Sequence, residues 1–181
     1  MTYSNEERIP LIDIIRDREY RCGAEVGVWK GVFSEFILQQ TSVDKLFLID
    51  SWSINDNIIP LSDGRTYVHE HGQTPETFEA AYQETEQRVQ PFGNRAEIVR
   101  ARSPEAAKRF DDRSLDFVYI DAIHYALWLT EDIEAWLPKV RKGGMLVGDD
   151  FTGMFPDVSR VIKERFGEVY ACGPTWLVES T

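Results

Sequence analysis

Short apolar runs alternate along this chain with segments in which apolar residues recur every three or four positions. The apolar runs have the length of β-strands and predict strands at residues 24–28, 45–50, 96–99, 115–121, 145–148, 167–172 and 175–180. The periodic segments predict helices at residues 6–16, 32–40, 104–110, 127–140 and 157–166, and from Thr74 onward. Strands that alternate with helices are typical of an α/β domain with a mostly parallel sheet.

The last two predicted strands are separated only by Gly173 and Pro174, which is close enough for a hairpin. A hairpin joins antiparallel strands, so the last strand is predicted to run against the others. The sequence therefore predicts a seven-stranded, mostly parallel sheet with an antiparallel last strand at its edge and helices on both faces. A chain of 181 residues with 43% hydrophobic content fits a single domain over residues 1–181.

Acidic residues outnumber basic ones, with 31 Asp and Glu against 20 Lys and Arg and a formal net charge of -11. Since no basic cluster offsets this charge, a phosphate backbone would be repelled, and nucleic acid is not expected as a partner. The first residues lack the regions of a secretory signal, and no apolar run approaches the roughly 18 residues that span a bilayer. We therefore expect a cytoplasmic protein without a membrane partner, in which Cys22 and Cys172 are buried thiols with no role.

Residues 51–73 form a polar stretch without clear periodicity. Loops of this length in a compact domain are usually lids or binding elements, so the stretch is predicted to recognise the substrate. His69 and His71 occupy alternate positions within it and are predicted to be solvent-exposed rather than to bind a metal ion. The next helix is predicted to have Thr74 as its N-cap and Pro75 at its first position.

Ligands of open parallel sheets bind outside the carboxyl ends of the strands. The first strand runs into AEVGVWKG, where Glu25, Gly27 and Gly31 precede a helix, although glycine in such a turn serves backbone geometry about as often as ligand approach. Trp29 stands where a dinucleotide fingerprint has its second glycine, so a pyrophosphate cradle is disfavoured. Asp50 ends the second strand, from where its carboxylate would accept hydrogen bonds from both ribose hydroxyls of a nucleoside.

Together these motifs resemble the class I S-adenosylmethionine-dependent methyltransferases. The resemblance rests on AEVGVWKG, LFLID, LDFVYIDAIHY and KGGMLVGDDF, and it covers nearly the whole chain, including the closing hairpin. It implies a Rossmann-like fold and S-adenosylmethionine as cofactor, with the adenine near Trp52 and Ser103, although Ser103 would alternatively only cap the helix at 104–110. The residues implied to bind the cofactor are Glu25, Gly27, Val28, Trp29, Gly31, Asp50, Ser51, Trp52, Ser103 and Asp121.

Within that class, the chain is similar to small bacterial macrocin-type sugar O-methyltransferases, whose fourth strand carries D-x-x-H and whose fifth strand ends in Gly-Asp-Asp. The resemblance implies that Asp121, Asp149 and Asp150 bind a magnesium ion. Asp121 and Asp149 end strands that are neighbours about 5 Å apart in this fold, so their carboxylates can share one ion. Alternatively, Asp149 and Asp150 only cap the following turn in solvent.

His124 follows Asp121 by three residues. An imidazole with an unperturbed pKa of about 6.5 would accept the proton of an acceptor hydroxyl beside the ion. His124 and Asp121 are therefore the predicted catalytic residues, against the alternative that His124 is structural.

The sequence thus predicts a magnesium-dependent O-methyltransferase whose partner is a small-molecule methyl acceptor, a hydroxylated sugar or natural product. The acceptor would contact residues 51–73, the residues after Asp121 and the loop at 151–156. One competing interpretation is a nicotinamide-dependent oxidoreductase, which the missing glycine fingerprint disfavours. Another is a non-catalytic S-adenosylmethionine-binding module or a subunit of a larger assembly. The acceptor's identity, the metal requirement and the oligomeric state, including a homo-oligomer, stay open.

Overall fold

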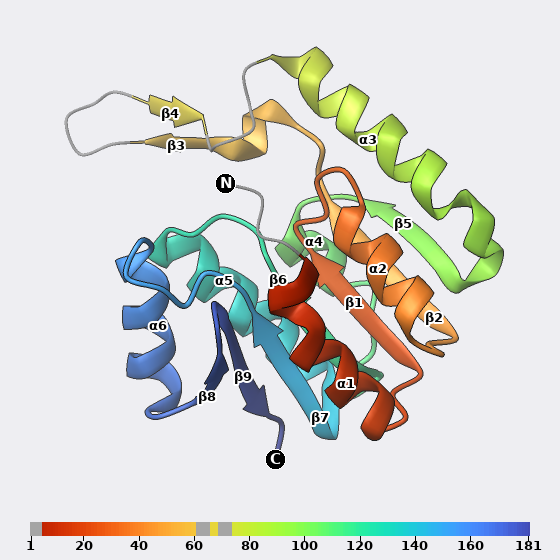
Figure 1. Cartoon of the computed structure of the whole chain (residues 1–181). Helices are drawn as coiled ribbons and strands as arrows, with labels where there is room; N and C mark the ends of the chain where they lie inside the picture. Colours follow the sequence, from red (N-terminus) through yellow and green to blue (C-terminus); the bar gives the residue numbers. More distant parts are fainter. Residues whose placement is uncertain (1–4, 61–65, 69–73) are drawn as a thin grey trace.

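Seven strands form the main sheet within residues 5–60, 66–68 and 74–181, the part of the chain that this computed structural model describes (Figure 1). They are β1 (Cys22–Val26), β2 (Lys45–Asp50), β5 (Ala96–Arg100), β6 (Leu115–Ile120), β7 (Val140–Gly148), β8 (Tyr170–Cys172) and β9 (Thr175–Glu179). Their order is β5-β2-β1-β6-β7-β9-β8, and every neighbouring pair from β5 to β7 is parallel. The predicted α/β fold with a mostly parallel sheet is confirmed.

Helices cover both faces of this sheet (Figure 1). One layer holds α1 (Ile9–Asp17), α2 (Val32–Gln40) and α3 (Pro75–Val89), and the other holds α4 (Ser103–Ala107), α5 (Ala126–Trp136) and α6 (Pro156–Phe166). In β6, Phe117 and Tyr119 pack into the first layer, whereas Val118 and Ile120 pack into the second. Because both faces of the strands are buried, the strands appear in the sequence as nearly continuous apolar runs.

The closing hairpin is placed differently from the prediction. β9 pairs antiparallel with both β7 and β8, so the reversed strand lies inside the sheet and β8 forms the edge. The fully buried Trp176 of β9 lies against Gly148 of β7, whereas Tyr170 of β8 is 62% exposed. β9, which carries the large buried side chain of Trp176, therefore occupies the inner position between β7 and β8.

The segment after β2 contains regular structure that its sequence did not indicate. A 3-10 helix, η2 (Ile54–Asn57), leads into β3 (Ile58–Pro60), which pairs antiparallel with β4 (Thr66–Val68). This two-stranded sheet extends away from the main sheet (Figure 1). The expectation of a wholly irregular loop is therefore wrong, while His69 and His71 lie outside the described residues and their exposure stays a prediction.

Several helix ends differ from the predicted boundaries. The opening helix begins as a 3-10 turn, η1 (Asn5–Arg8), before α1. The predicted helix at 127–140 ends as α5 at Trp136, because Pro138 lies in a further 3-10 turn, η4 (Leu137–Lys139). The remaining 3-10 helix, η3 (Gln90–Arg95), connects α3 to β5.

Thr74 caps α3 as predicted. Its hydroxyl oxygen accepts a hydrogen bond from the amide of Thr77, and Pro75 occupies the first helical position. No helix of the described residues is both long and apolar enough to cross a bilayer.

The parallel strands all end at one edge of the sheet, and the strand order fixes the sequence of residues along that edge. Ser103 follows β5, Asp50 ends β2, Gly27 follows β1, Asp121 follows β6 and Asp149 follows β7. Residues far apart in the chain thus form one row where ligands of such sheets bind.

A methyl group at position 148 is expected to destabilise the packing of β9 against β7. A Cβ atom there would lie 2.4 Å from the buried ring of Trp176, so the ring or the strand must move. We expect Gly148→Ala to lower the free energy of unfolding by about 1–3 kcal/mol, measured by urea denaturation. Gly153→Ala, at an exposed position where the added Cβ would meet no described atom within 4 Å, is the matched control and should change it by less than about 0.5 kcal/mol. Equal effects of the two substitutions would contradict this prediction.

Candidate active site

A cavity of roughly 670 Å³ opens at the carboxyl edge of the sheet. Its volume lies in the range of small-molecule and cofactor sites. Its wall runs from Ser103, after the edge strand β5, to Asp150, after β7, and includes the β1–α2 loop between them. Most of the predicted cofactor residues lie on this wall, namely Glu25, Gly27, Val28, Trp29, Asp50, Ser51, Ser103 and Asp121. The predicted residues Gly31 and Trp52 do not line it.

The carboxylate of Asp50 stabilises the conformation of the β1–α2 loop, residues 27–31. Its Oδ2 accepts hydrogen bonds from the amides of Val28 at 3.0 Å and Trp29 at 2.9 Å, and its Oδ1 accepts one from the amide of Trp52 at 2.8 Å. Burial raises the pKa of Asp50, although these amide donors oppose the shift. The carboxylate thus supports the loop backbone, and its predicted contact with ribose stays a prediction.

Glycine is required at two positions of this loop. Gly27 has a φ of +89°, and a Cβ atom there would lie 2.0 Å from the carbonyl oxygen of Asp121. Gly31 has a φ of +73° and precedes the first turn of α2. These conformations bring the loop backbone against the end of β6, so the loop and Asp121 line the same cavity.

Trp52 is a core residue rather than a cavity residue, which corrects its predicted contact with adenine. Its side chain is buried, its indole N–H donates to the carbonyl of Trp29 at 2.7 Å, and its ring packs edge-on against Tyr82. The indole therefore stabilises the backbone of the β1–α2 loop through its hydrogen bond to Trp29.

Ser103 faces the cavity, but its hydroxyl is engaged within the protein. It is the first residue of α4 and not the N-cap, a position that Arg102 occupies. Its oxygen accepts a hydrogen bond from the indole N–H of Trp136 at 2.8 Å, and its hydroxyl bonds the carboxyl group of Asp132. Burial raises the pKa of Asp132 to about 7.

Asp132 was not among the predicted site residues. The signal in the sequence was a carboxylate on the apolar face of the helix, next to Ile133 and one turn from Leu129 and Trp136. An acidic residue on such a face requires a partner, which here is Ser103.

Glu25 is buried beside the loop and accepts a hydrogen bond from the hydroxyl of Ser34 in α2. Burial raises the pKa of Glu25 to about 8, with the Ser34 hydrogen bond opposing the shift. At neutral pH this carboxyl group is therefore mostly protonated.

Arg8 is the main site residue that the sequence did not reveal. Its Nη2 lies 2.8 Å from Oδ2 of Asp121 and 2.5 Å from Oδ2 of Asp149, and its Nε donates to the same Asp149 oxygen at 3.1 Å. The guanidinium lies over the rings of Phe33 and Tyr119, 4.7 Å and 5.7 Å from their centroids. Asp149, whose side chain is fully buried, thus has a cation of the protein itself as its partner.

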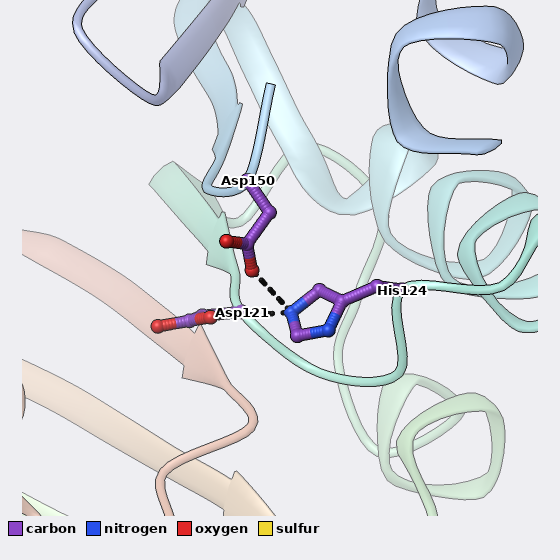
Figure 2. Close-up of side chains that lie close together, drawn as sticks. All are labelled: Asp121, His124 and Asp150. Carbon is purple, nitrogen blue, oxygen red and sulfur yellow. Dashed lines mark ion pairs between the residues drawn. The ribbon is translucent and has the colours of Figure 1, made fainter. Parts of the chain in front are cut away.

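His124 is paired with Asp150, the residue that follows Asp149. Its Nε2 forms an ion pair with Oδ2 of Asp150 and lies 3.9 Å from Oδ1 of Asp121 (Figure 2). Burial lowers the pKa of His124, but the hydrogen bonds and charges of Asp121 and Asp150 outweigh it and raise the pKa to about 10. The imidazole is therefore protonated at neutral pH in this state, whereas the predicted general base requires a neutral ring.

Within the described residues, a cluster with the spacing of a metal site consists of Asp121, His124 and Asp150. One oxygen or nitrogen atom from each of these side chains lies within 4.8 Å of those of the other two (Figure 2). The predicted set was Asp121, Asp149 and Asp150, and the structure places Asp149 on Arg8 instead. The structure thus brings together two of the three predicted ligands and adds His124.

A family model described as a methyltransferase domain matches residues 24–151. The chain belongs to this methyltransferase family. The matched segment includes the β1–α2 loop, Asp50 and all three residues of the Asp121, His124 and Asp150 cluster. The protein is an S-adenosylmethionine-dependent methyltransferase, and the match does not distinguish a macrocin-type subclass.

Solved structures share its fold at low sequence identity. A protein from Staphylococcus aureus assigned as a caffeoyl-CoA O-methyltransferase matches with a TM-score of 0.66 and 13% identity, covering 98% of this chain and 83% of that one. An rRNA methylase from Streptococcus thermophilus matches with a TM-score of 0.60 and 14% identity, covering 99% of this chain and 98% of that one. Spermidine synthase from Thermotoga maritima matches with a TM-score of 0.57 and 19% identity, covering 90% of this chain and 54% of that one. A comparison with curated protein sequences finds no match.

These structures show the fold alone, because proteins with different activities share it. The family match favours methyl transfer over the nicotinamide-dependent oxidoreductase, and it does not favour a non-catalytic binding module.

Replacing Glu25 by glutamine is expected to stabilise the protein increasingly as the pH rises. With a folded-state pKa of about 8 against 4.5 for the exposed group, the unfolded state loses its proton first between these pH values. Stability contributed by protonated Glu25 is therefore complete below pH 4.5 and declines as the pH rises toward 8. A glutamine side chain at this position would stay neutral throughout.

We expect Glu25→Gln to raise the free energy of unfolding by on the order of 3 kcal/mol at pH 8 and by little at pH 5. Urea denaturation of both proteins at the two pH values measures this difference. Ser34→Ala is the control for the hydrogen bond itself. A stabilisation independent of pH would contradict the prediction.

Proposed function

We propose that the protein is a divalent-cation-dependent O-methyltransferase that methylates a hydroxyl group of a small molecule such as a sugar or another natural product. The observation that carries this proposal is the cluster of Asp121, His124 and Asp150 on the wall of the same cavity as the glycine loop. A cofactor on the loop and an acceptor beside the cluster would meet within one cavity. Orientation of the two reactants accounts for a large part of the rate enhancement in such reactions.

The donor atoms of the cluster fit a divalent cation. Oδ1 of Asp150 is buried and has no hydrogen-bond partner among the described residues, so it retains acceptor capacity. Two carboxylates and one imidazole suit manganese or iron as well as the magnesium that the sequence predicted. When bound, the cation would lower the pKa of the acceptor hydroxyl.

The contacts of Arg8 favour the cluster of Asp121, His124 and Asp150 over a set with Asp149 as the ligands of the cation. Its guanidinium satisfies Oδ2 of Asp149 and one oxygen of Asp121, which leaves Oδ1 of Asp121 on the side of His124. Oδ1 of Asp149 and Oδ1 of Asp150 are both without a hydrogen-bond partner among the described residues, but the partner of Asp149 is a fixed guanidinium, whereas the partner of Asp150 is His124, itself a candidate ligand. His124 would hold the cation as a neutral imidazole, and without the cation its ring is protonated at neutral pH.

Apolar side chains complete the cavity near this cluster. Val32 and Met154 are exposed and line the cavity, and the ring of Phe155 packs 4.4 Å from that of His124. These surfaces favour an acceptor that carries an apolar portion next to its hydroxyl group.

Cofactor binding is the first test. Calorimetry with S-adenosylhomocysteine should show binding that Asp50→Ala weakens by more than tenfold, because the amides of Val28 and Trp29 lose their acceptor. Asp44→Ala, at the opposite end of β2, is the control and should bind normally. Failure of the unaltered protein to bind would remove the cofactor assignment.

The cation site is tested by comparing two neighbouring residues. We expect Asp150→Asn and His124→Asn to weaken Mn²⁺ binding at least tenfold, and Asp149→Asn to change it less than about threefold. Electron paramagnetic resonance of free Mn²⁺ measures binding without an acceptor. Equal losses for Asp149→Asn and Asp150→Asn would favour the ligands predicted from the sequence, and full methyl transfer in a chelator would refute the role of the cation.

A further inference from the structure

The carboxylates at the ends of β6 and β7 have two cationic partners, which come from different parts of the chain. His124 pairs with Asp150. Arg8, from η1, pairs with Asp149 and Asp121. The proposed function uses His124 as a ligand of the divalent cation and gives Arg8 no part beside it. An inference about Arg8 at this cation site therefore rests on the proposed function.

One nitrogen of Arg8 connects the ends of the two strands. Its Nη2 lies 2.8 Å from Oδ2 of Asp121 and 2.5 Å from Oδ2 of Asp149, so a single positive centre joins the carboxylates that follow β6 and β7. A divalent cation joins neighbouring carboxylate oxygens in the same way, at shorter distances. The guanidinium thus occupies a position at which Asp149 would otherwise share a cation with Asp121.

Asp149 keeps the capacity to bind a cation. Its Oδ1 is buried and has no hydrogen-bond partner among the described residues. Its backbone amide donates to the carbonyl of Ile120, which fixes Asp149 beside the end of β6. Neither its reach nor its donor atoms exclude Asp149 from the ligand set. What opposes a divalent cation on Asp149 is the positive charge of Arg8, because like charges at this separation repel strongly where water is excluded.

Arg8 is held by more than its two carboxylates. Its guanidinium lies 4.7 Å from the ring centroid of Phe33 and 5.7 Å from that of Tyr119, and its side chain is only 11% exposed. Contacts with aromatic faces stabilise a cation independently of ion pairs. Because arginine also keeps its charge over the whole pH range of a folded protein, Arg8 is a permanent and fixed positive centre.

We propose that Arg8 is a positioning residue that acts as a built-in counter-cation: it reserves Asp149 and thereby confines the divalent cation to Asp121, His124 and Asp150. Asp121 is shared between the two positive centres, with Oδ2 on Arg8 and Oδ1 3.9 Å from Nε2 of His124. A carboxylate that already compensates one charge attracts a second cation less strongly. Arg8 therefore lowers the affinity of the site for the divalent cation while it selects the ligands.

A purely structural Arg8 would have the opposite effect on affinity. If the guanidinium only neutralised buried carboxylates and fixed η1, its loss would disturb the ends of β6 and β7 and weaken cation binding. The direction of the change in Mn²⁺ affinity, together with its dependence on Asp149, separates the two roles.

The test measures Mn²⁺ binding to the full chain by electron paramagnetic resonance, without cofactor or acceptor. We expect Arg8→Met to tighten binding roughly tenfold or more, because the repulsion is lost and Asp149 joins the ligands. In the Arg8→Met background, Asp149→Asn should then weaken binding roughly tenfold or more, whereas in the unaltered protein it changes binding less than about threefold. Arg8→Lys keeps the charge and should bind Mn²⁺ within about threefold of the unaltered protein.

Arg102→Met is the matched control for the loss of an arginine charge. Arg102 lines the same cavity, but it follows β5, which β2 and β1 separate from β6. Its side chain is 47% exposed and pairs with Asp56 and Glu105. Solvent and salt screen such a charge, so Arg102→Met should change Mn²⁺ affinity less than about twofold.

Thermal unfolding gives a second measurement that stays informative if Arg8→Met is unstable. Without Mn²⁺ this variant is expected to unfold at a lower temperature than the unaltered protein, because a buried carboxylate has lost its partner. Added Mn²⁺ should raise its melting temperature more than that of the unaltered protein, since the ion binds more tightly and replaces the missing charge. A further Asp149→Asn substitution should abolish this extra stabilisation.

The outcomes distinguish the role of Arg8 from the proposed function. If the unaltered protein binds no Mn²⁺, the cation site of the proposed function fails. If it binds Mn²⁺ and Asp150→Asn weakens that binding, the cation site stands. The role of Arg8 is then overturned if Arg8→Met binds Mn²⁺ more weakly than the unaltered protein, or if Asp149→Asn has no effect in the Arg8→Met background.

Discussion

Three carboxylates, those of Asp121, Asp149 and Asp150, meet where β6 and β7 end, and because Asp149 and Asp150 are buried and Asp121 is partly buried, they require positive charge nearby. Arg8 supplies it for Asp149 and Asp121, and protonated His124 supplies it for Asp150. Removing one partner of such a buried pair typically costs about 3–5 kcal/mol, since the remaining charge is left uncompensated. The pairing thus ties the 3-10 turn η1 to the ends of two central strands, and it gives Asp149 and Asp150 different partners.

The same edge of the sheet also organises the rest of the cavity. Asp50 and Gly27 shape the β1–α2 loop, the first by accepting amide hydrogen bonds and the second by allowing the loop to pack on the carbonyl of Asp121. Both residues are therefore needed for the wall of the cavity whether or not they touch a ligand. Polar clusters lie at both ends of the row, and the loop lies between them, which matches an elongated ligand better than a compact one.

The structural relatives illustrate how little of this chemistry the fold determines. A protein assigned as an O-methyltransferase, an rRNA methylase and a spermidine synthase share the fold at 13%, 14% and 19% identity. The chemistry of this chain depends on its own side chains at the carboxyl edge, among them the imidazole of His124 and the guanidinium of Arg8. Function follows from such sites rather than from the sheet that carries them.

The sequence by itself determined the seven strands of the main sheet, their mostly parallel arrangement and the glycine loop, because hydrophobic periodicity and turn residues are local properties. It also placed Asp121 and Asp150 in one site, since parallel strands end at one edge. Only the tertiary structure decided that Arg8 pairs with Asp149, that Trp52 is a core residue, that Ser103 bonds Asp132, and that β9 lies between β7 and β8. Each of these depends on contacts between residues distant in the chain, which no local pattern specifies.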